Sequence, residues 1–277
     1  MTTREETGAF GPQSPLPPLP EDWERCLVVA AHPDDIEYGA ASAVARWTAQ
    51  GKRVTYLLAT RGEAGIDALH PAEAGPLREA EERAGAREVG VDTVEFLDHR
   101  DGVVEYGLDL RRDIVRAMRR HRPEVVVTGA FSVRMVAGVT HQADHRAVGL
   151  AALDAARDAG NRWIFPELAD EGLEPWGDVR LVCMAGPERP THAVDVTGEP
   201  LERGIASLSA HVEYTRGLGE QSFEPRPFLT WAARMGGSAL GVEAAVLFDV
   251  HHLAFEGRPP APRRARPRPA AGIRARS

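Results

Sequence analysis

The 277-residue sequence is poor in cysteine and has no long apolar run. Its two cysteines, Cys26 and Cys183, lie in short apolar stretches typical of buried strands, where a thiol packs as a small hydrophobic group, so no disulfide framework is expected. No stretch approaches the roughly 20 apolar residues that a membrane-spanning helix needs. Residues 1–22 also lack the apolar core of a secretory signal. We therefore expect a cytoplasmic protein without a membrane span.

The charge balance also excludes a class of partners. The formal net charge is −8, and the segment from Arg258 to the end contains seven arginines and no acidic residue, so the rest of the chain is more acidic still. An acidic body argues against nucleic acid as the main partner, because binding to phosphates requires a basic surface. Hydrophobic residues make up 43% and charged residues 27% of the chain, which is ordinary for a globular domain.

Composition divides the chain into three parts. Residues 1–22, with the stretch SPLPPLP, are expected to form an extended arm on the surface or to be disordered. Residues 23–256 have the composition of one folded domain. Residues 257–277 are rich in proline and arginine, and we expect this tail to be disordered and dispensable for the chemistry.

Short apolar runs alternate with amphipathic segments along the predicted domain. The predicted strands are Leu27–Ala31, Arg53–Thr60, Val94–Leu97, Glu124–Thr128, Val179–Met184, Ala193–Val196 and Ala244–Val250. The predicted helices are Ile36–Gln50, Glu73–Val89, Gly107–Arg120, a helix that opens in residues 140–146 and continues through Ala156, and Glu199–Tyr214. This alternation predicts an α/β fold, a single Rossmann-like doubly wound domain with a mostly parallel sheet.

The first predicted strand ends in the sequence His32-Pro33-Asp34-Asp35. Pro33 has no N–H for a central strand ladder, so the chain turns there. An imidazole and two carboxylates at the end of a buried strand are costly unless a cation neutralises them. His32 and Asp35 can converge on one divalent metal ion, which leaves Asp34 free to handle a proton. The alternative interpretation is an Asx-type turn that caps a helix.

A second polar cluster, THQADHR at residues 140–146, follows the fourth predicted strand. Ligands of open α/β sheets bind at the carboxyl ends of the strands, so this cluster and the segment at residues 32–35 can face the same crevice. Two histidines and one carboxylate form a three-ligand site with an open position, which is how catalytic zinc differs from structural zinc.

Three motifs at these places resemble the LmbE-like (PIG-L) family of zinc-dependent N-deacetylases. They are A-H-P-D-D-I-E-x-G at residues 31–39, T-x-G-E-x-G at residues 60–65 and D-H-R-A-V-G at residues 144–149. The resemblance covers most of residues 25–250 and implies the LmbE-like fold and removal of acetyl or other acyl groups from amino sugars or their conjugates. It further implies that His32, Asp35 and His145 bind Zn²⁺, or Fe²⁺ in its place, and that Asp34 is the general base.

Several other polar residues each have two interpretations. Glu63 contacts a sugar hydroxyl, as its place in the family motif favours, or is a solvated residue of a glycine loop. Asp144 orients a ligand histidine or caps a helix. Arg78 is kept as a candidate substrate-binding residue with Glu63, although arginines such as Arg78 and Arg146 are more often surface charges. No role follows for the remaining histidines, His211 among them.

The chain departs from the family three residues before the ligand histidine. Better-known members have H-x-D-H, whereas this sequence has Gln142 at that position and a histidine, His141, one residue earlier. In one hypothesis His141 acts as the acid through a shifted loop. In the other, Gln142 stabilises the oxyanion while Asp34 serves as base and then as acid. The sequence slightly favours the second, because it needs no change in the register of the loop.

Other functional classes fit the sequence less well. A nucleotide-binding Rossmann protein needs a glycine-rich turn directly after the first strand, and here the first glycine is Gly39. A non-haem iron oxygenase also uses two histidines and a carboxylate, but on a different, all-β core. A non-catalytic sugar-binding or scaffold protein with the same fold, and an amidase that cleaves a larger conjugate, are the alternatives left open. The expected partner is a small-molecule N-acyl amino sugar, and a homo-oligomer is compatible with the sequence.

Overall fold

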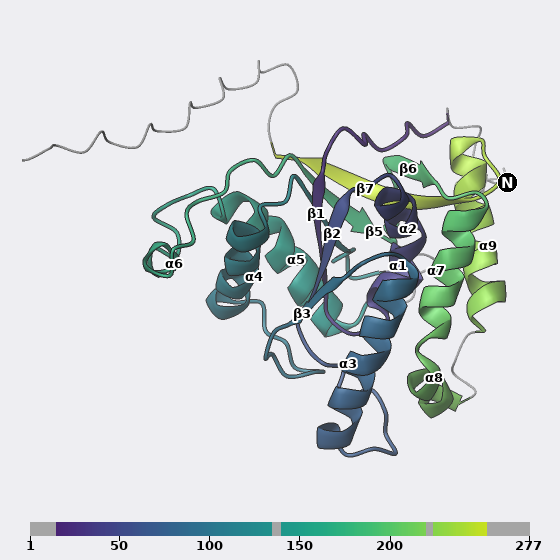
Figure 1. The fold of residues 1–277 in the computed structure, drawn as a ribbon, viewed down its shortest axis with the longest axis horizontal. Helices are drawn as coiled ribbons and strands as arrows, with labels where there is room; N and C mark the ends of the chain where they lie inside the picture. The colour runs from purple at the N-terminus through teal and green to yellow at the C-terminus, as the bar shows by residue number, and fades with distance from the viewer. Residues whose placement is uncertain (1–14, 135–139, 220–223, 254–277) are drawn as a thin grey trace, which may run out of the picture.

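Seven strands form one sheet in the computed structural model, which describes residues 15–134, 140–219 and 224–253 (Figure 1). Their order is β3-β2-β1-β4-β5-β7-β6. The strands are β1 (Arg25–Ala30), β2 (Arg53–Leu58), β3 (Thr93–Phe96), β4 (Val125–Gly129), β5 (Leu181–Ala185), β6 (His192–Asp195) and β7 (Ala245–His252). Only β7 runs antiparallel to its neighbours in this sheet. The predicted mostly parallel α/β sheet is therefore confirmed.

Helices cover both faces of the sheet. On one face lie α4 (Leu108–His121), α5 (Ala143–Asp158) and the short α6 (Glu167–Asp170) (Figure 1). On the other lie α1 (Asp35–Gly39), α2 (Ala41–Ala49), α3 (Pro71–Glu88), α7 (Glu199–Ser209), α8 (Val212–Leu218) and α9 (Pro225–Leu240). This two-sided cover explains why central strands such as β1 and β5 are apolar runs without polar alternation.

The central strand β1 shows how its alternate residues serve two cores. Leu27 and Val29 pack into the apolar cluster that includes the inner faces of α4 and α5. Cys26 and Val28 pack into the opposite cluster, which includes residues of α1 and α2. Both cysteines of the chain are buried and free, and no disulfide joins them. Among the described residues, no helix has the length and the apolar character that crossing a membrane requires.

Two predicted helices are broken in the structure. The helix predicted over Ile36–Gln50 is interrupted at Ala40, whose backbone leaves the helical region, and forms α1 and α2. The helix predicted over Glu199–Tyr214 ends at Ser209, and α8 begins only after His211, which has φ −83° and ψ 58°. Helix α9 has no counterpart among the predicted helices, because prolines in its first turn and adjacent glycines obscure the helical pattern.

The two ends of the chain extend beyond the described residues. Of the predicted arm, residues 1–22, only the part from residue 15 is described. This part is extended and pairs with β6, where the Leu19 N–H donates to the carbonyl of Ala193 at 2.9 Å and the Leu19 side chain is buried. The predicted tail, residues 257–277, lies outside the described residues.

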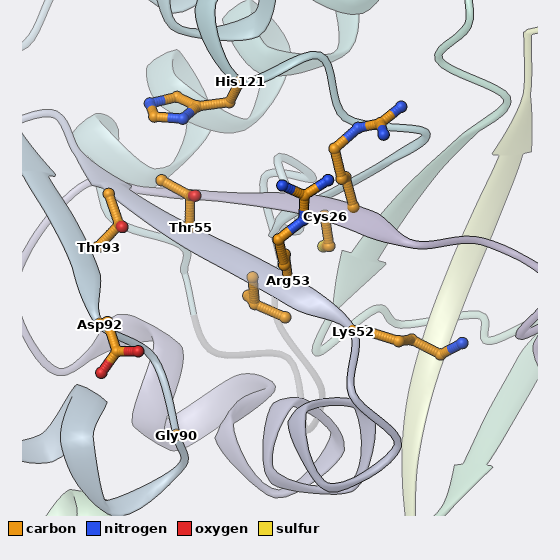
Figure 2. Close-up of a pocket in the computed structure, with 10 residues that line it drawn as sticks. Cys26, Lys52, Arg53, Thr55, Gly90, Asp92, Thr93 and His121 are labelled. Carbon is orange, nitrogen blue, oxygen red and sulfur yellow. The ribbon is translucent and has the colours of Figure 1, made fainter.

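The amino-terminal ends of β1, β2 and β3 border a hollow of about 330 Å³ (Figure 2). Its walls carry basic and hydroxyl side chains, including Arg53, Thr55 and His121. None of the residues singled out for chemistry from the sequence lines it. Those residues gather instead at the opposite, carboxyl edge of the sheet.

Candidate metal centre

Four loops meet at the carboxyl edge of the sheet, because β3, β2, β1 and β4 are adjacent and parallel. The strand order reverses between β1 and β4, which makes this the switch point where open α/β sheets bind their ligands. His32 follows β1, Glu63 follows β2, Asp101 follows β3 and His141 follows β4. The residues that the sequence predicted to face one crevice are therefore brought to the same edge of the sheet.

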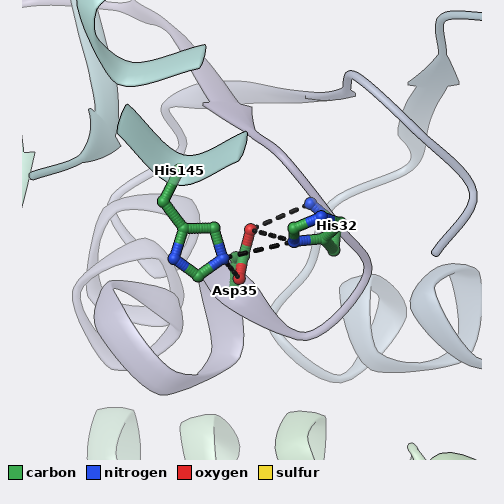
Figure 3. Close-up of side chains that lie close together, drawn as sticks. All are labelled: His32, Asp35 and His145. Atoms are coloured by element: carbon green, nitrogen blue, oxygen red, sulfur yellow. Dashed lines mark hydrogen bonds and ion pairs between the residues drawn. The ribbon is translucent and has the colours of Figure 1, made fainter. Parts of the chain in front are cut away.

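His32, Asp35 and His145 converge at this edge (Figure 3). His145 Nε2 lies 2.9 Å from Asp35 Oδ1 and 3.2 Å from His32 Nδ1. His32 Nδ1 lies 3.5 Å from Asp35 Oδ2. Ligand atoms that surround a tetrahedral ion at about 2.0–2.1 Å are separated from one another by about 3.3 Å. The three side chains thus have the spacing of ligands around one ion.

The chemistry of these atoms also fits a cation. Two imidazole nitrogens 3.2 Å apart repel each other unless a proton or a metal ion lies between their lone pairs. Asp35 is held in place independently, because its Oδ2 accepts the backbone N–H of His32 at 2.9 Å and of Ala31 at 3.1 Å. Nitrogen and carboxylate ligands with an open side are the donor set of a catalytic divalent metal.

His32 is oriented by two further carboxylates. Its Nε2 lies 3.0 Å from Asp101 Oδ1 and 3.3 Å from Asp144 Oδ2, so this nitrogen carries the proton. Nδ1 then faces Asp35 and His145, which together with His32 form what we call the ligand cluster. Burial opposes charge on the imidazole, but Asp35, followed by Asp101 and Asp144, raises the pKa of His32 to about 12. So much negative charge around one histidine favours a cation at this place.

Asp144 is not the helix cap that one interpretation of the sequence proposed. The N-cap of α5 is Gln142, and no side chain caps that position. Asp144 is buried, and its two oxygens accept the N–H groups of Gly102 at 2.7 Å and Val104 at 3.1 Å. It therefore ties the loop after β3 to His32. Asp101 was missed, although the rule that singled out polar loops after the first and fourth strands applies equally to the third.

Asp34 lies beside the ligand cluster but points to another partner. Its Oδ1 accepts a hydrogen bond from Arg78 Nη2 at 3.1 Å, and both side chains are buried. Burial raises the pKa of Asp34 to about 7, although the nearby Arg78 opposes that shift. A carboxyl group with a pKa near neutrality is suited to accept a proton and to release it again.

The interpretation of Arg78 as a surface charge is wrong, because this residue is only 2% exposed. Its guanidinium donates to the carbonyl of Gly62 at 3.0 Å and lies 3.7 Å from the centre of the Tyr214 ring. A Cβ atom at Gly62 or Gly65 would collide with this guanidinium, which explains both glycines of the T-x-G-E-x-G motif. Tyr214, on α8, was not singled out from the sequence.

Glu63 connects two loops of the site. Its Oε2 accepts the N–H of Arg61 at 3.2 Å, and its Oε1 accepts the N–H of Asp101 at 2.9 Å. Both oxygens thus have backbone partners, and contact with a sugar hydroxyl stays a prediction. The other arginine considered, Arg146, donates to the carbonyl of His141 and so supports the loop that enters α5.

The two candidates for assisting the leaving group differ in position. His141 is buried, with its ring 5.1 Å from that of His145 and its Nδ1 3.2 Å from the carbonyl oxygen of Ser132. Burial, aided by the neighbouring His145, lowers the pKa of His141. Gln142 is exposed at the start of α5. The structure thus brings His141 to the ligand cluster and leaves Gln142 at the surface.

The sequence matches a known family model over residues 27–156, described as GlcNAc-PI de-N-acetylase (PIG-L). A deacetylase of 1D-myo-inositol 2-acetamido-2-deoxy-alpha-D-glucopyranoside from Streptomyces scabiei is 30% identical over 234 residues, which cover 72% of this chain and 69% of that protein. The diacetylchitobiose deacetylase of Thermococcus kodakarensis is 27% identical over 192 residues, covering 69% of this chain and 70% of that protein.

Solved structures share the fold. The N,N'-diacetylchitobiose deacetylase of Pyrococcus horikoshii superposes with a TM-score of 0.74 at 23% identity, over 84% of this chain and 85% of that chain. The 4-carboxy-2-hydroxymuconate hydratase of Pseudomonas putida superposes with a TM-score of 0.69 at 19% identity, over 85% of this chain and 99% of that chain. One fold thus occurs in a deacetylase and in a hydratase, so the fold alone does not decide the reaction.

Proposed function

The chain belongs to the PIG-L family of de-N-acetylases, and on this premise we propose that it is a metal-dependent hydrolase that removes an acetyl group from the amine of an amino sugar or amino-sugar conjugate. The observation that carries the proposal is the convergence of His32, Asp35 and His145 within 2.9–3.5 Å of one another. Asp34, a buried carboxyl group with a raised pKa, lies next to them.

We assign the metal to His32 Nδ1, Asp35 and His145 Nε2, and zinc is the ion that this donor set suits best. Such an ion, when bound, polarises an amide carbonyl and lowers the pKa of a bound water. Asp101 and Asp144 hold His32 so that Nδ1 is directed to the ligand cluster. The backbone N–H groups of Ala31 and His32 hold Asp35 in the same way.

The chain's own residues then move the protons. Asp34 takes a proton from the attacking water, while Arg78 fixes the direction of its carboxylate. The amide C–N bond breaks, the amine takes one proton from a donor, and acetate leaves. Asp34 then releases its proton to solvent, and solvent reprotonates the donor. We assign the role of this donor to His141 in place of Gln142, because His141 is buried against His145 whereas Gln142 is exposed. Its Nδ1 faces the Ser132 carbonyl, so Nε2 is the atom that exchanges the proton.

The substrate class is drawn from the relatives. The names of the Streptomyces and Thermococcus proteins both describe deacetylation of an N-acetylated amino sugar joined to a second ring, an inositol in one and a sugar in the other. We propose an N-acetylglucosamine unit with such a substituent as the substrate of this chain.

Removal and return of the metal test the proposed function. The purified protein is expected to release primary amine from N-acetylglucosaminyl-inositol or diacetylchitobiose, to lose this activity on chelation and to regain it with Zn²⁺ or Fe²⁺. Amine release is measured with a fluorescent amine reagent, and metal content by elemental analysis. Undiminished turnover after complete removal of the metal contradicts the proposal, as does a fully loaded protein that releases no amine from any N-acyl amino sugar.

The roles of His141 and Gln142 are separated by a pair of variants. His141→Ala is expected to lower kcat by about 10² or more, the usual contribution of a positioned general acid, and to remove the basic limb of the pH profile of kcat. Gln142→Ala, the adjacent exposed residue, is the matched control and should change kcat little. A severe loss in Gln142→Ala with His141→Ala nearly silent would restore the preference that the sequence suggested.

A further inference from the structure

Two residues of α3 form hydrogen bonds with the turn that presents Asp34. Arg78 Nη2 donates to the carbonyl of Pro33, and Glu82 Oε2 accepts the N–H of Asp34 at 3.1 Å. The carbonyl of Pro33 and the N–H of Asp34 belong to one peptide unit. Arg78 and Glu82 lie four residues apart and therefore occupy neighbouring positions on one face of the helix. Helix α3 thus holds this peptide at both ends.

This peptide needs external support because Asp34 has an unfavourable backbone conformation. Its φ of 91° and ψ of −24° lie in the left-handed region, which residues other than glycine rarely adopt. Such a conformation persists only where the surroundings enforce it, and it is common where a side chain must be aimed. Here it directs the Asp34 carboxylate to Arg78, while Asp35, the next residue, points to the ligand cluster.

Glu82 lies within a buried polar group. His211 Nε2 lies 3.8 Å from Glu82 Oε2 and 3.7 Å from Glu37 Oε2, and all three side chains are buried. Ser207 Oγ donates to Glu37 Oε1 at 3.0 Å or to the carbonyl of Gly85 at 2.8 Å. A Cβ atom at Gly85 would lie 2.9 Å from the Ser207 carbonyl oxygen, so this glycine permits α3 and α7 to approach closely. The break between α7 and α8 at His211 places the imidazole in this group.

We propose that Glu82, which lies beside the buried His211, is a positioning residue for Asp34, and that its acceptor oxygen fixes the general base without touching the metal ligands. The proposal rests on the proposed function, in which Asp34 takes the proton from water. Burial, aided by the Glu37 carboxylate, raises the pKa of Glu82 well above its ordinary value. A glutamine at position 82 keeps the shape of this side chain and a carbonyl oxygen that can accept the Asp34 N–H.

Two substitutions at this position separate the acceptor from the rest of the side chain. Glu82→Leu keeps the approximate volume and removes the acceptor, and it is expected to lower kcat by about 10²-fold with the metal content unchanged, because a small displacement of a catalytic group has that effect. Glu82→Gln keeps a carbonyl oxygen for the Asp34 N–H and is expected to remain within about threefold of the native kcat. A glutamine variant as impaired as the leucine variant would overturn the proposal.

A double-variant cycle tests whether Glu82 acts through Asp34. In the Asp34→Asn background, Glu82→Leu is expected to lower kcat by less than about threefold, because the group that it positions has already lost its function. Additive losses would contradict the proposal. The control is Asp158→Leu, which removes a buried carboxylate paired with Arg111 on the opposite face of the sheet. This control should reduce stability while leaving kcat unchanged.

Hydrogen exchange at the Asp34 amide tests the hydrogen bond from this amide to Glu82 without any substrate. A negative result in this experiment is therefore distinct from failure of the proposed function. Exchange of this amide should be at least about tenfold faster in Glu82→Leu than in the native protein and in Glu82→Gln. Equal protection in all three would overturn the proposal. So would a second metal ion per chain that is lost in His211→Asn, because Glu37, Glu82 and His211 would then be a metal site.

Discussion

His32→Ala and His145→Ala are each expected to lower the metal content of the purified protein and to abolish measurable amine release. Each change removes one of three protein ligands, and even changes to residues that only orient a ligand typically cost about 10- to 100-fold in metal affinity or activity. Loss of His32 also leaves Asp101 and Asp144, both directed at its Nε2, without their shared partner. Metal stoichiometry and affinity are measured by elemental analysis and by competition with a chelator.

The control is His121→Ala. This histidine also pairs with a carboxylate, Glu95 at 2.8 Å, but it lies at the amino edge of the sheet, beside the hollow there. The His121→Ala variant should therefore keep the native metal content. If His32→Ala or His145→Ala binds zinc at full stoichiometry and with native affinity, the assignment of the ligands is incorrect.

Asp34→Asn is expected to behave differently, keeping its metal and losing a factor of about 10² to 10⁴ in kcat, the usual contribution of a positioned general base. The metal is retained because Asp34 bonds to Arg78, whereas Asp35 faces His32 and His145. Asparagine keeps an acceptor oxygen for the buried Arg78, so the protein should still fold. It cannot take the proton from water.

Metal content, thermal stability and kcat are measured on the same preparation of Asp34→Asn. Asp113→Asn is the matched control, because Asp113 also pairs with an arginine, Arg116, but on α4, away from the site. Loss of metal in Asp34→Asn with native metal content in Asp35→Asn would show that the two aspartates have exchanged roles. Native kcat in a loaded Asp34→Asn would remove the general base from the mechanism.

The sequence by itself determined the elements of the sheet and the central motif. Apolar runs such as Leu27–Ala31 and Glu124–Thr128 identify strands covered on both faces, because only a doubly covered strand lacks polar alternation. His32 and Asp35 are three residues apart within one turn, so their convergence is a local property that spacing reveals. The rule that ligands bind at the carboxyl ends of parallel strands then predicted that residues 140–146 lie beside His32 and Asp35.

The tertiary structure decided which distant side chains surround that motif. Arg78 is a charged residue in a helix rich in charged residues, so its sequence context resembles that of a surface residue. It is buried because α3 packs against the turn at Asp34. Asp101 reaches His32 because β3 and β1 belong to one parallel sheet, so the loops that follow them leave the same edge.

The same holds for the residues behind Asp34. Glu82 and His211 belong to α3 and to the break between α7 and α8, and no periodicity in the sequence relates them. Their contacts join residues far apart in the chain, and such contacts depend on how the helices cross. A local pattern can therefore point to candidate metal ligands such as His32 and Asp35, whereas the groups that contact them and Asp34 become visible only when the elements are packed together.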